Sequence, residues 1–125
     1  MAYVNLTSDM VDNVASLPNL TSLVMSDMAA GPPLSPLANL TSLSHLEIEG
    51  SSYYTQQPFP IWISNLTSLA SLHLYFYNIS TAIPSTILSL PHLKDLDLFT
   101  NYNLIVNLSF FVKHAFQLNS LLNIS

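Results

Sequence analysis

Cysteine and arginine are both absent from this sequence of 125 residues. Without cysteine the chain has no disulfide framework and no thiolate metal site. The basic residues are Lys94 and Lys113. The chain has seven acidic residues, so the formal net charge is −5. Nucleic-acid binding requires basic side chains that displace the counterions of the phosphates. Two lysines are too few for that, and we exclude nucleic-acid binding.

Long apolar runs are also missing, although the mean hydropathy is +0.41. A membrane-spanning helix requires about 18 uninterrupted apolar residues. The best candidate, residues 104–116, is interrupted by Asn107, Ser109 and Lys113, so we expect no membrane-spanning segment. Residues 1–5 show no basic region followed by an apolar one, so we expect no signal peptide in this chain. The leucines instead stand singly between polar residues, which indicates a repeating core.

A phrase of the form Leu-x-x-Leu-x-x-Leu-x-Leu recurs along the chain. Its copies begin at Leu17, Leu40, Leu66 and Leu90. Their spacing falls within the range of about 20–29 residues that is typical of leucine-rich repeats. The copies and a degenerate fifth unit predict repeats over residues 1–25, 26–48, 49–74, 75–98 and 99–125.

The two terminal units leave alternatives open. The first unit aligns from Leu17, but matching its Asn-Leu-Thr to the other copies would shift it by three residues and place Ser26 in the core. The fifth unit is either a distorted repeat, with Asn123 at its last strand position, or the place where the pattern ends. Its expected core positions are Val112, Ala115, Leu118 and Leu121.

The repeated phrase predicts a strand followed by a short return limb. Leu-x-Leu has the period of a strand with one buried face. The proline after Phe59 or Ile83 removes a backbone donor and restricts φ, so the return limb should be irregular or 3₁₀-like. No unit can bury its leucines alone, so units must stack. We predict an α/β leucine-rich-repeat solenoid: a right-handed superhelix with a parallel concave β-sheet and an irregular, 3₁₀-like convex side.

Residues 83–101 resemble the plant-specific leucine-rich-repeat consensus, Ile-Pro-x-x-Ile-x-x-Leu-x-x-Leu-x-x-Leu-x-Leu-x-x-Asn. Residues 59–69 and 97–104 resemble segments of plant receptor-like proteins and receptor-like kinases. The resemblance covers roughly residues 14–125. It implies an extracellular module that binds a peptide or protein ligand in defence or development signalling. A co-receptor is a further partner that the resemblance allows.

The sequence departs from this family at several positions. The family's ladder asparagine, whose side chain normally pairs with the backbone of the next turn, is retained as Asn101. Thr81 replaces a glycine, and the cysteine-paired caps are missing. Because capping units keep solenoid ends soluble, we expect the isolated chain to be marginally stable or prone to aggregation. The other ladder positions hold Met28, Ser51 and Tyr77.

Asn-x-Ser/Thr triplets mark N-glycosylation acceptors in surface loops of secreted proteins. Because Asn-Leu-Thr-Ser-Leu is itself a repeated phrase, three of the triplets can also be one event that was copied. The triplets favour an extracellular or cell-surface location of the parent protein, of which this chain would be a fragment, a mature segment or the translation of an incomplete gene model. The candidate acceptors are Asn5, Asn19, Asn39, Asn65, Asn78, Asn107 and Asn123.

The outward residues of the predicted strands should form columns, because neighbouring strands lie about 4.8 Å apart. We predict an acidic face with aromatic edges for a basic or mixed peptide or protein, in which Tyr75 and Phe99 act as anchors. The alternative is an ordinary solvated sheet face, where charges collect in any case. The candidate ligand-binding residues are His45, Glu47, Glu49, Ser71, His73, Tyr75, Asp95, Asp97 and Phe99.

A column of Glu47, His73 and Asp97 could suggest a metal centre. Metal ligands must converge, whereas outward side chains on flat strands should diverge, so we predict no metal site and no cofactor. A GxSxG-type nucleophile elbow is impossible, because the glycines are Gly31 and Gly50 only. We therefore predict no catalytic residues. The remaining hypotheses are the receptor module, a structural or intracellular scaffold repeat, and a truncated, non-functional gene product.

Overall fold

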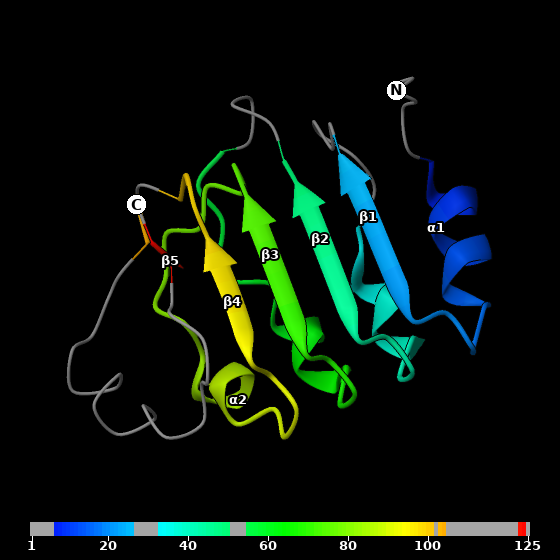
Figure 1. The fold of residues 1–125 in the computed structure, drawn as a ribbon. Helices are drawn as coiled ribbons and strands as arrows, with labels where there is room; N and C mark the ends of the chain where they lie inside the picture. The colour runs from blue at the N-terminus through cyan, green and yellow to red at the C-terminus, as the bar shows by residue number, and fades with distance from the viewer. Residues whose placement is uncertain (1–6, 27–32, 51–54, 102, 105–122, 125) are drawn as a thin grey trace.

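The computed structural model describes residues 7–26, 33–50, 55–101, 103–104 and 123–124. In this part of the chain, five parallel strands form one sheet in the order β1-β2-β3-β4-β5 (Figure 1). Strand order equals chain order, so each turn of the chain adds one strand to the edge of the sheet. The strands are β1 (Ser22–Ser26), β2 (His45–Glu49), β3 (Ser71–Tyr75), β4 (Asp95–Leu98) and β5 (Asn123–Ile124).

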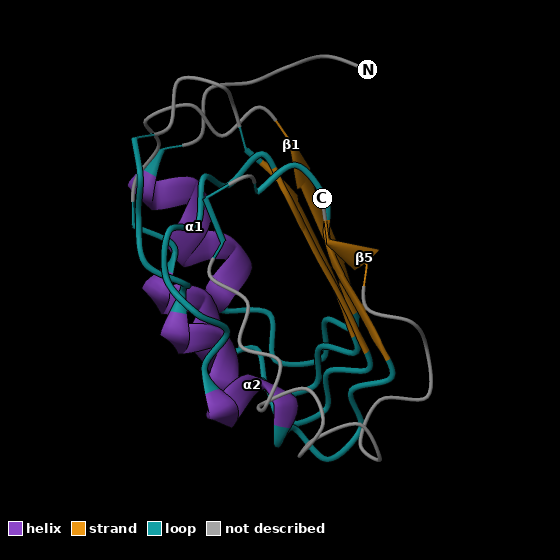
Figure 2. Ribbon diagram, turned by 90° about the vertical axis from the view of Figure 1, so that its left-hand side faces the viewer, coloured by secondary structure: helices purple, strands orange, loops and turns teal. Residues whose placement is uncertain are grey.

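The return limbs form a second layer on one side of this sheet (Figure 2). Three of them are short: the 3₁₀ helices η1 (Ser35–Asn39) and η2 (Ile61–Asn65), and one α-helical turn, α2 (Ser85–Leu88). Each of the three has a proline at its start; in α2, for example, this residue is Pro84. The predicted α/β solenoid with a parallel sheet is therefore confirmed, and the described part of its opposite side combines 3₁₀ and α-helical turns.

The first unit has a longer helix than we expected. Helix α1 (Ser8–Ala15) contains no proline, and the Thr7 hydroxyl caps it by accepting a hydrogen bond from the Met10 amide at 3.2 Å. Val11 of this helix is 2% exposed and supplies the core contact of the first return limb. Leu17 is 50% exposed, whereas the equivalent Leu40 and Leu66 are fully buried, because the first unit lies at the edge of the sheet, where strand β1 has a neighbour on one side only.

The strand register follows the alignment of the Leu-x-Leu phrases. Leu23 pairs with Leu46, Leu46 with Leu72, and Leu72 with Leu96. The first unit is therefore aligned from Leu17, and the alternative three-residue shift is wrong because Ser26 pairs with Glu49 in an outward column.

The fifth unit is offset by one residue from the predicted alignment. Asn123 pairs with Asp97 and Ile124 pairs with Leu98, whereas Asn123 was expected opposite Leu98. The offset pairs an isoleucine, rather than an asparagine, with Leu98. The other expected core positions of this unit lie outside the described residues; they are Val112, Ala115, Leu118 and Leu121.

The core is a continuous apolar stack between the two layers. Leu46 and Leu72 have no exposed surface, and Leu96 is 1% exposed. From the opposite layer, Ile63 and Ile87 are also fully buried. Burial of one such side chain stabilises a fold by about 1.5–3 kcal/mol, so the stacking of successive units holds the sheet in register.

Backbone groups between the strands are satisfied by repeated hydrogen bonds. The Ser44 carbonyl, for example, accepts from the amides of Ala70 and Ser71 at 2.8 and 3.0 Å. Thr81, at the family's glycine position, accepts a hydrogen bond from the Phe59 amide at 2.9 Å. A threonine hydroxyl thus links two turns here. No helix among the described residues is long and apolar enough to cross a membrane.

Asn101 forms the ladder contact at the end of the fourth repeat and is 1% exposed. Its Nδ2 donates to the carbonyls of Leu74 and Leu98 at 2.7 and 2.9 Å. Its Oδ1 accepts from the amides of Tyr77 and Ile79 at 3.1 and 3.3 Å. The side chain therefore pairs with the backbone of the preceding turn and of its own turn. Most of the next turn lies outside the described residues, so the expected pairing with it stays a prediction.

Candidate functional site

The candidate site is the open face of the sheet, opposite the helical layer. Strand register places His45, Ser71 and Asp95 in one column and Glu47, His73 and Asp97 in the next. The predicted columns are therefore confirmed at these positions. Glu49 and Tyr75 pair in the third column, and Phe99 follows the end of β4 with 45% of its surface exposed.

His73 is the centre of a polar cluster on this face. Its Nδ1 lies 3.2 Å from Oε1 of Glu47 on β2, and its Nε2 lies 2.7 Å from Oδ2 of Asp95 on β4. The Ser71 hydroxyl donates to the same Asp95 oxygen at 3.1 Å. The His45 ring meets the His73 ring edge-on, with the centroids 5.4 Å apart. Three neighbouring strands thus contribute side chains to one network.

Two opposing effects act on the pKa of His73. Partial burial disfavours the charged imidazolium and by itself lowers the pKa. The hydrogen bonds with Asp95 and Glu47, together with the charges of Asp95 and Asp97, outweigh burial and raise the pKa above its usual value of 6.5. The acidic surroundings therefore favour a positive charge at this position on the sheet.

A second feature is a shallow hollow of about 400 Å³ beside the ends of β2, β3 and β4. The Tyr75 hydroxyl donates to Oδ2 of Asp97 at 3.3 Å, and the Phe99 amide donates to Oδ1 of Asp97 at 3.0 Å. Burial and the nearby carboxylates raise the pKa of Tyr75 to about 12, so it is neutral at physiological pH. The residues lining the hollow are Glu49, Tyr75, Phe76, Asp97 and Phe99.

Phe76 is the lining residue that the sequence interpretation missed. It follows β3 directly, has a φ of 53°, and leaves 41% of its surface exposed. Thr100, at the same place after β4, has a φ of 67°, and its hydroxyl accepts from the Phe76 amide at 2.8 Å. The alternation of a strand alone would not place Phe76 beside Tyr75, because this reversal of φ occurs only at the strand end.

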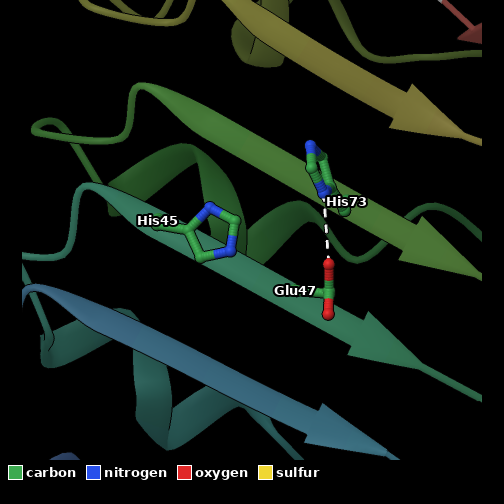
Figure 3. Close-up of side chains that lie close together, drawn as sticks. All are labelled: His45, Glu47 and His73. Carbon is green, nitrogen blue, oxygen red and sulfur yellow. Dashed lines mark hydrogen bonds and ion pairs between the residues drawn. The ribbon is translucent and has the colours of Figure 1, made fainter.

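The expectation that outward side chains diverge is wrong for one group of residues. One ligand atom each from His45, Glu47 and His73 lie within 4.8 Å of one another (Figure 3). An imidazole is long enough to reach across the strand spacing of about 4.8 Å, and the in-register pairing of Glu47 with His73 brings the two together. Asp97, the third member of the predicted column, contacts Tyr75 instead.

The candidate glycosylation residues fall into four groups. Asn19, Asn39 and Asn65 are exposed, and the last two end the equivalent helices η1 and η2. Asn78 is half-buried, and its Oδ1 accepts from Nδ2 of Asn103 at 2.9 Å. Asn123 lies on β5. The two remaining candidates, Asn5 and Asn107, lie outside the described residues.

The comparisons with known proteins bear on the fold. No family model and no curated protein matches the chain. Among solved structures it is similar to internalin C2 from Listeria monocytogenes, with a TM-score of 0.67 and 25% sequence identity. The match covers 97% of this chain and 48% of the internalin chain, so the chain spans about half the length of that protein. Together with the stacked Leu-x-Leu strands, this likeness identifies the fold of the chain as a leucine-rich-repeat solenoid.

Proposed function

We propose that the chain is a recognition module that binds a basic segment of a peptide or protein on the open face of its sheet. The observation that carries the proposal is the hollow between Glu49, Tyr75, Phe76, Asp97 and Phe99. It combines three aromatic rings with two carboxylates on an open surface. This function requires no catalytic step and no cofactor.

The hollow has the chemistry of a site for a lysine or arginine side chain. Aromatic faces attract a cation within about 6 Å of the ring centroid, by about 0.5–2 kcal/mol. Glu49 and Asp97 supply negative charge at the same place, and the chain as a whole carries a net charge of −5. Such complementarity speeds association with a basic partner and disfavours an acidic one.

A binding experiment without a known partner can use a displayed peptide library. We expect selection on the immobilised chain to enrich peptides that carry lysine or arginine next to an apolar residue. The double variant Glu49→Gln/Asp97→Asn should bind the selected peptides at least about tenfold more weakly, since two charge-assisted contacts are worth about 1.5 kcal/mol or more.

The matched control is Asp9→Asn/Asp12→Asn. It also removes two negative charges, but from exposed positions on α1, away from the sheet face. We expect it to retain wild-type binding. Equal losses in both double variants would show that net charge alone drives binding. Enrichment of acidic peptides, or unchanged binding by Glu49→Gln/Asp97→Asn, would contradict the proposed site.

We further propose that the module belongs to the extracellular part of a plant-type receptor-like protein. The resemblance of residues 59–69 and 83–101 to that class supports this, as do the exposed Asn39 and Asn65 in their Asn-Leu-Thr triplets. The test is expression through a secretory pathway followed by enzymatic deglycosylation. A mass shift that disappears in Asn39→Gln/Asn65→Gln supports the proposal. Absence of any shift favours the structural or intracellular scaffold instead.

A further inference from the structure

We infer that His45, Glu47 and His73 form a binding site for a divalent zinc ion on the sheet face. The inference concerns a ligand of a different class from the proposed peptide and does not depend on the peptide being bound. Two imidazoles and one carboxylate are donors that zinc takes in proteins, in sites where three protein ligands leave a fourth position open.

The distances suit a tetrahedral ion. With zinc–ligand bonds of about 2.1 Å, neighbouring donor atoms in a tetrahedron lie about 3.4 Å apart. Oε1 of Glu47 and Nδ1 of His73 are already 3.2 Å apart. The three donor atoms, one each from His45, Glu47 and His73, lie within 4.8 Å of one another. Figure 3 shows the three side chains on the two neighbouring strands. His45 is the donor that must close the remaining distance, from at most 4.8 Å to about 3.4 Å.

The remaining nitrogen of His73 has the partner that a zinc-binding histidine requires. Nε2 lies 2.7 Å from Oδ2 of Asp95, so with Nδ1 on the metal, Nε2–H donates to this carboxylate. Such a carboxylate–histidine–zinc arrangement orients the ring and raises its basicity. Asp95 is itself held by the Ser71 hydroxyl at 3.1 Å. The outer shell of the site is therefore in place on β3 and β4.

The backbone under the site is rigid enough to hold the donors in place. On β2, Leu46 and Ile48 alternate with the ligands, and both are fully buried. On β3, Leu72 and Leu74 flank His73 and are also fully buried. Donors on adjacent, packed strands lose little entropy when an ion binds, which favours a preformed site.

The donor types select among metals. Calcium and magnesium prefer all-oxygen sites, whereas imidazole nitrogen suits zinc and other late first-row metals. Cysteine is absent from the sequence, which disfavours soft ions that seek thiolates. The three donors are half-buried rather than enclosed, so the open position faces solvent and would hold water or a donor from a partner.

The experiment is a titration of the chain, first stripped with a chelator, with zinc chloride by calorimetry and with cobalt(II) by visible absorption. We expect one zinc ion per chain and an intense cobalt spectrum of tetrahedral type. His45→Asn, Glu47→Gln and His73→Asn should each weaken zinc binding at least about tenfold, as is usual when a ligand or its orienting partner is lost. Circular dichroism of each variant verifies that the sheet is retained.

Two matched controls separate this site from adventitious binding. His92→Asn removes an exposed histidine from a return limb, and Glu49→Gln removes an acid from the same face, two residues beyond Glu47. Both should retain wild-type zinc affinity. Asp95→Asn should lower it by about 10–100-fold if Asp95 orients His73. The inference is overturned if the wild type binds no zinc, if His92→Asn loses as much affinity as His45→Asn, or if Asp95→Asn binds normally. Peptide binding measured in chelator tests the proposed function separately.

Discussion

Asn101 shows how much one residue contributes to a turn of this solenoid. Its amide joins two carbonyls and two backbone amides of successive turns and is buried with them. Buried backbone groups without partners are costly. One side chain therefore satisfies four groups: two carbonyls on β3 and β4 and two amides in the segment that follows β3.

Replacing Asn101 by alanine should lower the free energy of unfolding by about 3 kcal/mol, because buried donors and acceptors lose their partner at about 1–3 kcal/mol per group, partly offset by water. Chemical denaturation followed by circular dichroism measures the change. Asn103→Ala is the control, since Asn103 is exposed; we expect a change within about 0.5 kcal/mol. Equal effects in the two variants would contradict the assigned role of Asn101.

Tyr77 stands at the ladder position of the preceding repeat and is 7% exposed. Burial raises its pKa to about 12 from the usual 10. Because the folded-state pKa is above that of the unfolded chain, this contribution to stability is complete below pH 10 and is lost as the pH rises through about 12.

We therefore expect an alkaline titration, followed by tyrosinate absorbance, to show tyrosines that ionise only above pH 10. Their ionisation should coincide with loss of the folded structure. Tyr77→Phe should remove one late-ionising group from the six tyrosines of the chain. A single ionisation step of all six tyrosines near pH 10, with the structure intact, would show that Tyr77 is accessible to solvent.

At the scale of the elements, the short helices on the convex side act mainly through their inward residues, which are Leu37 in η1, Ile63 in η2, and Ile87 and Leu88 in α2. Ile87 of α2 has no exposed surface, whereas Ile61 at the start of η2 is 70% exposed. Both residues are isoleucines in equivalent elements, so they form a matched pair.

Ile87→Ala should lower the free energy of unfolding by about 2–5 kcal/mol, through lost burial and the cavity that remains. Ile61→Ala should change it by less than about 0.5 kcal/mol. Urea denaturation of the two variants measures the difference. Similar losses in both would mean that α2 is not packed into the core as described.

At the scale of the whole molecule, the stack is best packed in its middle. Leu72 and Leu74 of β3 are fully buried, whereas Leu23 and Met25 of the edge strand β1 are only half-buried. Val24, on the open face of β1, is 56% exposed. An edge strand with exposed apolar residues offers unpaired backbone groups to another chain.

The isolated chain should therefore be marginally stable and aggregate at high concentration. Val24→Lys should reduce aggregation, measured by light scattering after size-exclusion chromatography, because lysine on an edge strand opposes strand pairing. Ile61→Lys adds the same charge to the convex side and should help less. A reversible, cooperative melt of a monodisperse wild-type monomer would contradict this expectation.

Much of the fold could be predicted from the sequence. Each Leu-x-Leu phrase carries its own alternation of buried and outward residues, and the phrases recur at intervals that suit one turn of a solenoid. The pairing of Leu23, Leu46, Leu72 and Leu96 follows from that pattern. The same pattern predicts the columns of the candidate site, because the side chain of a residue between two buried leucines of a strand points to the outward face.

The contacts between those outward residues were decided by the tertiary structure. Rotamers and strand spacing determine that His73 contacts Glu47 and Asp95 while Asp97 contacts Tyr75. The same holds for Phe76, which reaches the hollow through a positive φ. The sequence by itself determined which residues share a face, since burial of apolar residues is a property of the repeat. Which of them meet depends on distances of a few ångströms across strands, and only the packed sheet sets these.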